Sequence, residues 1–318
     1  MRKPFYIVVL SVLAILGCGS ENKISDEILN TEVDLRVSRF DNEFAKATAE
    51  DIPKLRKVYP YLFPAPDSVW VAKLHDSLQI ELWEEVKTEF VDFDVEVADL
   101  EMLFKHIKYY FPKYEVPRII TVTNDVDYNN RIILADSLLL IGLDNYLGPD
   151  HRYYAGMQNY IAADMNRDFI ISNIASAFAN KVVPGPKDRT FLARIIYNGK
   201  ILYLKDKLMP FHSDEQKITY SEDQLAWARA NEEPMWRHFI EQELLYSTDN
   251  KLSLRFLDPA PFSKFGLELD NESPGRLGRY VGWQIVRSFM DKNEVDLPQL
   301  LNLSAEDIFK ESNYKPNK

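Results

Sequence analysis

Histidine is the side chain best suited to acid–base or metal chemistry near neutral pH, so the five histidines of this 318-residue chain are the first candidates for chemistry. They are His75, His106, His151, His212 and His238. A helix-borne zinc pair needs two imidazoles three or four residues apart on one face of a helix, and no two of these histidines have that spacing. The sequence therefore predicts no resident metal ion and no other cofactor.

His151 has the most polar surroundings of the five, because Asp150 and Arg152 flank it and Asp144 lies shortly before it. We take Asp144 and His151 as a possible polar site. The alternative is a surface histidine that caps a helix, which is the commoner role for such a residue.

A stretch of acidic and amide residues is partly similar to a calcium-binding loop. Asp125, Asp127 and Asn129 match the first three ligand positions, and Asp136 matches the twelfth. Asn130 stands where such a loop needs a glycine, and the flanking residues have the composition of strands. A turn between two strands of a hairpin is therefore the better interpretation.

The sequence lacks the motifs of serine hydrolases and of nucleotide-binding enzymes, and its charge does not suit nucleic acid. The chain has no G-x-S-x-G, no phosphate-binding glycine loop and no G-x-G-x-x-G. It carries 49 acidic and 38 basic residues, and its net charge of −11 becomes 36 − 49 = −13 once residues 1–17 are removed. Nucleic acid requires a basic surface, so we expect no nucleic-acid partner.

Residues 1–17 have the pattern of a bacterial lipoprotein signal peptide. Arg2 and Lys3 precede about a dozen mostly apolar residues, and Cys18, the single cysteine, follows Gly17. The apolar run is too short to cross a membrane, which takes roughly 20 residues. We predict cleavage before Cys18 and attachment of lipid to it, which anchors the chain to a membrane. An ordinary secretory signal followed by a free cysteine is the alternative.

The residues after Cys18 indicate in which membrane the protein is anchored and how the anchor is joined to the folded part. Gly19 and Ser20 follow Cys18, so the aspartate that retains lipoproteins in the inner membrane is missing. We therefore expect a periplasm-facing anchor, most simply in the outer membrane. Residues 18–30 are polar and lack periodicity, which predicts a lipidated N-terminus with a flexible tether.

Residues 31–318 are predicted to form a single globular domain of the α+β class that is mainly helical. In the part from 31 to 142 we expect a strand near 33–37, long helices at 71–90 and 97–111, and strands at 119–123 and 131–141. Turn-forming residues join the last two strands, which favours a small, mostly antiparallel sheet.

The part from 143 to 318 is predicted to be almost entirely helical. The expected helices lie near 168–182, 188–208, 221–246, 274–292 and 304–312. Gly199, in the middle of the second of these helices, marks a close helix crossing, because a mid-helix glycine costs about 1 kcal/mol relative to alanine.

The helix at 274–292 has its own glycine pattern. Gly275, Gly278 and Gly282 form a smooth face that should pack against a neighbour. Ser273 is the expected N-cap, with Pro274 in the first turn.

Several segments together resemble the gliding-motility lipoprotein GldB family of Bacteroidota. They are the signal ending in Cys18 and the stretches 141–148, 150–154, 199–203, 273–278, 281–283 and 312–316. The resemblance extends from the signal to the last residues. It implies a membrane-anchored component of the gliding machinery that works with other gliding-motility lipoproteins and with the linked type IX secretion proteins.

The helical half also resembles, more remotely, a zincin-type metallopeptidase that has lost its zinc motif. The segment 168–175 contains no histidine, and Asn198 stands at the position that aligns with the glutamate ligand. The resemblance implies a pseudoenzyme whose vacated cleft is lined by Asn198, Lys200, Tyr203 and Arg279. No residue is predicted to be catalytic.

Two classes of function follow from these observations. The first is a non-enzymatic lipoprotein that binds or scaffolds partner proteins. The alternative is a cell-envelope hydrolase, or a peptide- or glycan-binding module, on a metallopeptidase-like fold.

Overall fold

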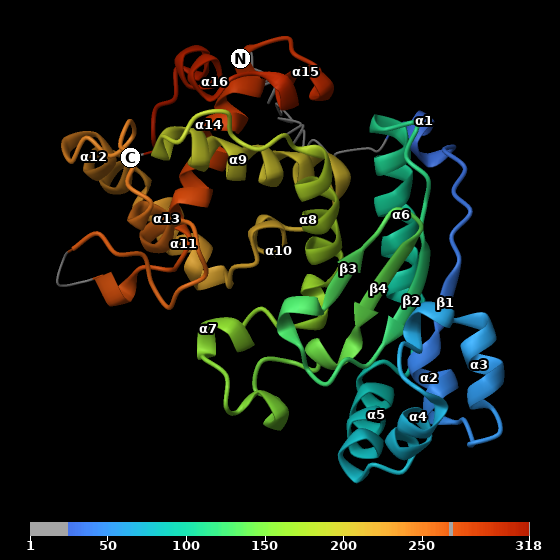
Figure 1. Ribbon diagram of the computed structural model, residues 1–318. Coiled ribbons are helices and arrows are strands. Elements are labelled where there is room, and N and C mark those ends of the chain that lie inside the picture. Colours follow the sequence, from blue (N-terminus) through green and yellow to red (C-terminus); the bar gives the residue numbers. More distant parts are fainter. Residues whose placement is uncertain (1–24, 267–269, 318) are drawn as a thin grey trace, which may run out of the picture.

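A four-stranded sheet lies beside α6 (Asp94–Tyr110) and α8 (Ile170–Val182), and most of the C-terminal helices extend away from it on one side (Figure 1). The computed structural model describes residues 25–266 and 270–317. The strands are β1 (Val37–Arg39), β2 (Arg118–Val122), β3 (Ile132–Leu134) and β4 (Leu138–Gly142), in the order β1-β2-β4-β3. The fold is α+β and mainly helical, as the sequence predicts.

The expectation of a mostly antiparallel sheet is wrong. β1 pairs with β2 in parallel, β2 pairs with β4 in parallel, and only β3 and β4 are antiparallel. The segment 131–141 contains two strands rather than one, and the chain between β2 and β3 is not a hairpin turn, because β4 lies between these strands. The predicted strand at 33–37 forms at Val37–Arg39 instead.

Both faces of the sheet are buried, which explains the parallel pairing. Ile119 belongs to the main core and Ile120 to a second core, because successive side chains point to opposite faces of a strand. Both residues are 0% exposed. The second core is built around Phe40, Phe44 and neighbouring aromatic rings.

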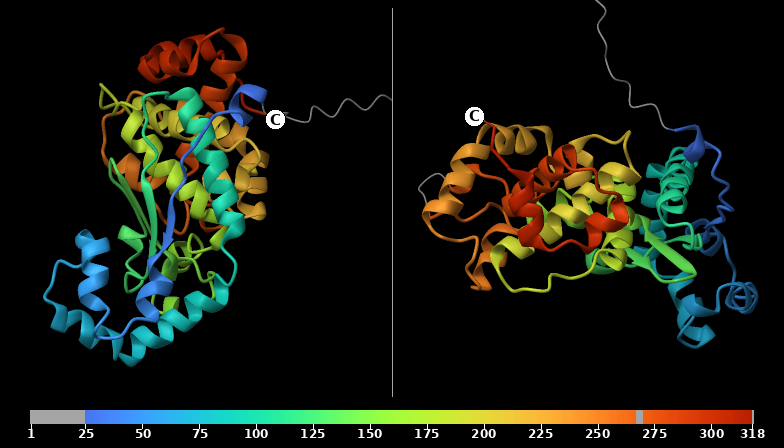
Figure 2. Two further views of the ribbon diagram at one scale, coloured as in Figure 1. Left: turned by 90° about the vertical axis from the view of Figure 1, so that its right-hand side faces the viewer. Right: turned by 90° about the horizontal axis from the view of Figure 1, so that it is seen from above.

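The first half of the chain supplies the helices around the second core and one long helix of the main core. Their bounds are α2 (Phe40–Ala45), α3 (Ile52–Val58), α4 (Asp67–Leu74), α5 (Ser77–Glu89) and α6 (Asp94–Tyr110). The predicted helix at 71–90 is therefore two helices. The first ends at Leu74, and the Asp76 side chain caps the second at the backbone N–H groups of Leu78 and Gln79. Figure 2 shows α2 to α5 at the end of the molecule opposite to the C-terminal helices.

The predicted tether at 18–30 is partly wrong. Residues 18–24 lie outside the described residues, but Asp26–Leu29 form a short helix, α1, that packs against α6. Ile28 is buried, and the Tyr109 hydroxyl donates a hydrogen bond to Glu27. The folded part therefore begins before Thr31.

The second half is helical, as predicted. Its helices are α7 (Asn159–Ala162), α8 (Ile170–Val182), α9 (Phe191–Leu208), α10 (Asp214–Ile218), α11 (Glu222–Ala230), α12 (Glu232–Glu241), α13 (Lys251–Phe256), α14 (Leu277–Lys292), α15 (Leu297–Asn302) and α16 (Ala305–Ser312). The predicted helix at 221–246 is two helices that meet at Asn231. None of the helices in the described part of the chain has the length and apolar character of a membrane span.

The predicted start of α14 is wrong, and the predicted glycine contacts are confirmed in part. The residue before the helix is Arg276, with φ 62°, and the Ser273 hydroxyl donates to the backbone oxygens of Ser263 and Asp270 instead of capping the helix. Gly199 of α9 and Gly282 of α14 form the close crossing. A Cβ added to Gly199 would lie 2.2 Å from the Gly282 carbonyl oxygen, so the two backbones touch.

Candidate functional site

A polar pocket of about 180 Å³ lies between α8, α9, the end of α10 and the start of α14. We call it the cationic pocket. Its charged lining residues are Arg131, Asp164, Lys205, Lys217, Arg276 and Arg279. Five of these six side chains are basic, in a protein whose net charge is −11.

Lys205 forms part of the inner wall of the pocket. It belongs to α9, whose first turn is capped by the Thr190 hydroxyl, and it is 3% exposed. Its ammonium group donates to the Ser172 hydroxyl at 2.9 Å and to the Lys217 carbonyl oxygen at 2.7 Å. Both acceptors are neutral, so they satisfy hydrogen bonds without neutralising the charge.

The two arginines near the start of α14 are also fixed by backbone oxygens. Arg276 donates to the Thr219 hydroxyl at 2.9 Å and to the Thr219 carbonyl oxygen at 2.8 Å, and it lies 3.6 Å from Asp164. Arg279 donates through Nε to the Leu257 carbonyl oxygen at 2.5 Å. Thr219, with φ 57°, and Arg276 both have left-handed backbones, which cost free energy at residues other than glycine and concentrate at functional sites.

Arg131 reaches the pocket from the loop before β3. Its guanidinium lies 3.9 Å from the centre of the Tyr128 ring and donates to the Tyr128 carbonyl oxygen at 3.0 Å. Its Nε is buried and finds no hydrogen-bond acceptor among the described residues. A buried donor in this state is rare in folded proteins and calls for an explanation.

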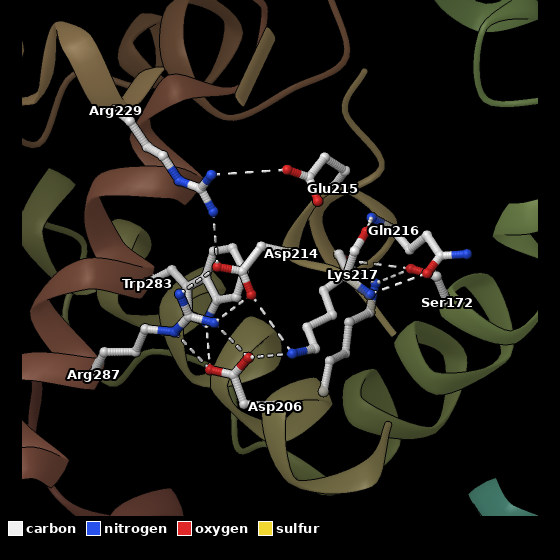
Figure 3. A network of polar contacts seen from close by, with 11 residues as sticks. Ser172, Asp206, Asp214, Glu215, Gln216, Lys217, Arg229, Trp283 and Arg287 are labelled. Carbon is white, nitrogen blue, oxygen red and sulfur yellow. Dashed lines mark hydrogen bonds and ion pairs between the residues drawn. The ribbon is translucent and has the colours of Figure 1, made fainter. Parts of the chain in front are cut away.

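One of the basic residues of the pocket, Lys217, has carboxylate partners that lie outside the pocket. Lys217 lies 3.2 Å from Asp206 and 3.6 Å from Asp214, and Arg287 binds the same two carboxylates (Figure 3). Burial alone would raise the pKa of Asp214, but the Arg287 hydrogen bond and the neighbouring positive charges hold this pKa below its ordinary value. The charge of Lys217 is therefore balanced outside the pocket.

The remaining basic groups of the pocket repel one another. Burial, reinforced by the charges of Arg276 and Arg279, lowers the pKa of Lys205 to about 7. Burial, with the charge of Arg276, lowers the pKa of Arg279 to about 10. Asp164 is the single carboxylate among the lining residues, so positive charge exceeds negative charge at this site.

The lining also contains neutral polar groups from the two central helices. Asn173 and Ser176 come from α8, and Asn198 comes from α9. Each of the three has a donor already engaged within the protein: Asn173 to the Tyr146 hydroxyl, and Ser176 and Asn198 to backbone oxygens one turn earlier. Their remaining polar atoms complete a surface suited to holding a polar ligand.

Over residues 25–266 and 270–317, no three His, Cys, Asp or Glu side chains come together as a metal site would require.

The structure brings together two of the four residues predicted to line the vacated cleft. Asn198 and Arg279 both line the cationic pocket. Lys200 points elsewhere, because its ammonium group donates to the carbonyl oxygens of Leu301 and Leu303 at 3.0 and 2.8 Å. Tyr203 is buried, with the Lys207 ammonium group over its ring. Successive positions on a helix point in different directions, so residues 198, 200 and 203 could not all face one cleft.

Asp144 and His151 do not form one polar site. Asp144 is 0% exposed, and its carboxylate accepts hydrogen bonds from the backbone N–H groups of Asn124 and Val126. Burial raises the pKa of Asp144 to about 6. His151 instead lies 3.4 Å from Glu85 and caps a short 3₁₀ turn.

The acidic stretch that is similar to a calcium loop is engaged with its own neighbours. Asp125 lies 3.1 Å from the Lys73 ammonium group and accepts from Gln79. Asp127 accepts from the backbone N–H of Asn129. These carboxylates bind different neighbours, and within the described residues they belong to no group of three that could hold a metal ion.

Of the six charged residues that line the cationic pocket, only Arg279 was predicted from the sequence. The other five were not predicted: Arg131, Asp164, Lys205, Lys217 and Arg276. Lys205 carried a signal, because it follows the apolar run 201–204 on a helix that is buried on most sides. A lysine in such a place is seldom buried without a role. Arg131 and Arg276 lie in loops whose course the sequence does not specify.

Comparison with known proteins identifies the family. A family model described as gliding motility protein GldB matches residues 21–316. The chain belongs to this family. The resemblance found from the sequence motifs is thereby confirmed. No curated protein and no solved structure matches the chain, and the remoter likeness to metallopeptidases stays a prediction.

Proposed function

We propose that this chain is a lipid-anchored component of the gliding machinery that acts by binding rather than by catalysis. Membership of the GldB family supports the role in gliding. The observation that carries the binding role is the cationic pocket, whose basic side chains are held by backbone oxygens in a fixed arrangement. Such an arrangement suits recognition, because the donors are oriented before the ligand arrives.

The anchor is Cys18, and the chain faces the periplasm, most simply from the outer membrane. Gly17 and Cys18 follow an apolar run too short to span a membrane, which supports this arrangement. The helix α1 begins at Asp26, so few residues separate the lipid from the folded part. Other gliding-motility lipoproteins and secretion-machinery proteins linked to type IX secretion are then within reach as partners.

The Cys18→Ser variant tests the anchor. Serine lacks the sulfur that carries the lipid, so the protein should move from the membrane fraction to the soluble fraction, and gliding should be lost at unchanged protein level. Each buried methylene contributes about 0.8 kcal/mol to membrane binding, so the acyl chains on Cys18 determine whether the protein is found in the membrane fraction or the soluble fraction. The measurement is cell fractionation with gliding recorded on the same cultures. Residence of the serine variant in the membrane would contradict the proposed anchor.

The alternative function is a hydrolase of the cell envelope, or a peptide- or glycan-binding module. One observation favours a metallopeptidase-like ancestry: Asn198, at the position that aligns with a metal ligand, does line the pocket between α8 and α9. An amide is a much poorer zinc ligand than a carboxylate. Loss of the ligand while the cleft remains is what we expect of a binding protein derived from an enzyme.

A further inference from the structure

We propose that the cationic pocket binds an oxyanion, a carboxylate or phosphate group carried by a small ligand. This inference goes beyond the role in gliding, because it concerns the chemistry of a site and not the process that the site serves. It rests on the arrangement of Arg131, Lys205 and Arg279.

These three side chains carry positive charge without a carboxylate partner. Within the described residues, no Asp or Glu oxygen lies at salt-bridge distance from any of them, whereas Lys217 and Arg276 each have at least one such partner. Asp164 is already shared between Arg276 and the Tyr128 hydroxyl, which donates to it at 3.3 Å. The pocket therefore holds more positive charge than its own residues neutralise.

Buried charge without a partner destabilises a protein. A buried charge that has no partner is strongly unfavourable, because it loses its hydration without compensation. Lys205 is 3% exposed, and burial together with the charges of Arg276 and Arg279 disfavours its charged form. An anion that enters the pocket would supply the missing negative charge.

The donors left over can form hydrogen bonds to such an anion. A guanidinium has five N–H groups, and Arg279 donates one hydrogen bond, through Nε, to a described acceptor. The Nε of Arg131 is buried and lacks an acceptor in the part of the chain that the structure describes. Planar guanidinium groups bind carboxylate and phosphate oxygens in pairs, which is why they recur where these groups are recognised.

The size and walls of the pocket limit the ligand. A volume of about 180 Å³ accommodates an oxyanion and a small attached group. Ile201, Leu202 and Pro259 provide apolar surface for that group, and Asn173 and Asn198 provide polar contacts. Phosphate and carboxylate ligands are distinguished by testing a probe of each kind.

Binding is measured by calorimetric titration of the full-length protein in detergent, at constant ionic strength held with chloride. Sodium phosphate is one probe and N-acetylalanine is the other. N-acetylalanine amide, which has no charge, is the control ligand. We expect saturable binding of at least one anion and none of the amide. Absence of binding by both anions at millimolar concentration, or equal binding of the amide, would overturn the proposal.

Two variants locate the site. Lys205→Met keeps an unbranched side chain that is shorter by one atom and removes the charge. Arg279→Gln removes a second charge. Each should weaken anion binding at least about tenfold, because a hydrogen bond to a charged group contributes about 1.5–3 kcal/mol. Arg237→Gln, at an exposed arginine on α12 paired with Glu233, is the matched control and should bind as the original chain does. Unchanged affinity in both pocket variants would refute the site.

The original chain gives a test that needs no variant. The groups that face Lys205 are Arg276 and Arg279 near the start of α14, Asp164, Arg131, Ser172 of α8 and the Lys217 carbonyl of α10. Because the pKa of Lys205 is about 7 in the empty pocket, affinity for N-acetylalanine should fall about tenfold from pH 6 to pH 8 as the ammonium group loses its proton. The carboxylate of the probe stays ionised throughout this range. Affinity that is independent of pH would contradict the role of Lys205.

Discussion

At the scale of single residues, burial shifts the pKa values of a buried lysine and a buried aspartate in opposite directions. Burial lowers the pKa of Lys205 and raises the pKa of Asp144, because in both cases it disfavours the charged form. The two residues have different roles in our account. Lys205 lines a pocket that a ligand can enter, whereas Asp144 fixes the loop after β2 through the backbone N–H groups of Asn124 and Val126.

Burial of Asp144 should make the folded state less stable as pH rises. Its pKa is about 6 in the folded chain, against an ordinary value of 3.8, so the folded state binds more protons between these values. The stability of the original chain should therefore fall, relative to Asp144→Asn, by up to about 3 kcal/mol as pH rises from about 4 to about 6. The measurement is urea unfolding of both proteins across this range.

A matched control separates this effect from the loss of one negative charge. Asp136→Asn removes a carboxylate that is fully exposed and paired with Lys181. It should show no such fall over the same range. A difference between the original chain and Asp144→Asn that is constant, or grows, as pH rises would contradict the account.

Much of the candidate site could not be predicted at this scale. Asn198 and Arg279 were predicted to share a cleft, and they do line one pocket. Lys200 and Tyr203 were assigned to it from the remote resemblance to metallopeptidases, but a helix turns residues at these spacings toward different surroundings. Arg131 and Arg276 reach the pocket from loops, where the sequence pattern gives no direction for a side chain.

At the scale of elements, the crossing of α9 and α14 holds the two helices that carry Lys205 and Arg279. Gly199 and Gly282 were predicted from sequence to mark close packing, since glycine in the middle of a helix needs a reason. A Cβ on Gly282 would lie 1.9 Å from the carbonyl oxygen of Ile195. Real side-chain carbons do not approach backbone oxygens so closely, so the helices would have to separate.

Gly282→Ala should therefore destabilise the protein by about 1–3 kcal/mol or more, because overpacking at a rigid backbone contact cannot be relieved by a rotamer change. Gly156→Ala is the control, since a Cβ there meets nothing within 4 Å. It should change stability by no more than about 0.5 kcal/mol. Thermal unfolding followed by circular dichroism measures both, and equal melting temperatures for the two variants would show that this crossing is not tight.

The elements show why the sheet was predicted incorrectly. The segments 119–121 and 138–141 are nearly continuous apolar runs, and such runs are typical of parallel strands covered on both faces. An antiparallel strand exposed on one face alternates apolar and polar residues. The turn-forming residues between the two segments favoured a hairpin, but they form a loop that leads to β3 at the edge of the sheet. Helix positions, which depend on local spacing, were predicted far better.

At the scale of the whole molecule, the proposed lipid anchor and a folded body with a basic pocket together indicate a component that holds a ligand near the membrane. A buried cluster around Glu232 keeps the C-terminal end in place: the carboxylate accepts hydrogen bonds from the hydroxyls of Tyr280 and Tyr314. Tyr314 and Asn317 are thus held against α12 through Glu232, which also binds Tyr280 of α14.

Binding and catalysis differ in how function depends on the amount of protein. A binding component is needed in fixed proportion to its partners, whereas an enzyme turns over many substrates and tolerates scarcity. A binding role is therefore tested by placing the production of this protein under graded control and recording the fraction of gliding cells at each level. We predict that the fraction of gliding cells falls in step with the amount of protein. Full gliding retained at about a tenth of the normal amount would contradict the claim that the protein acts by binding.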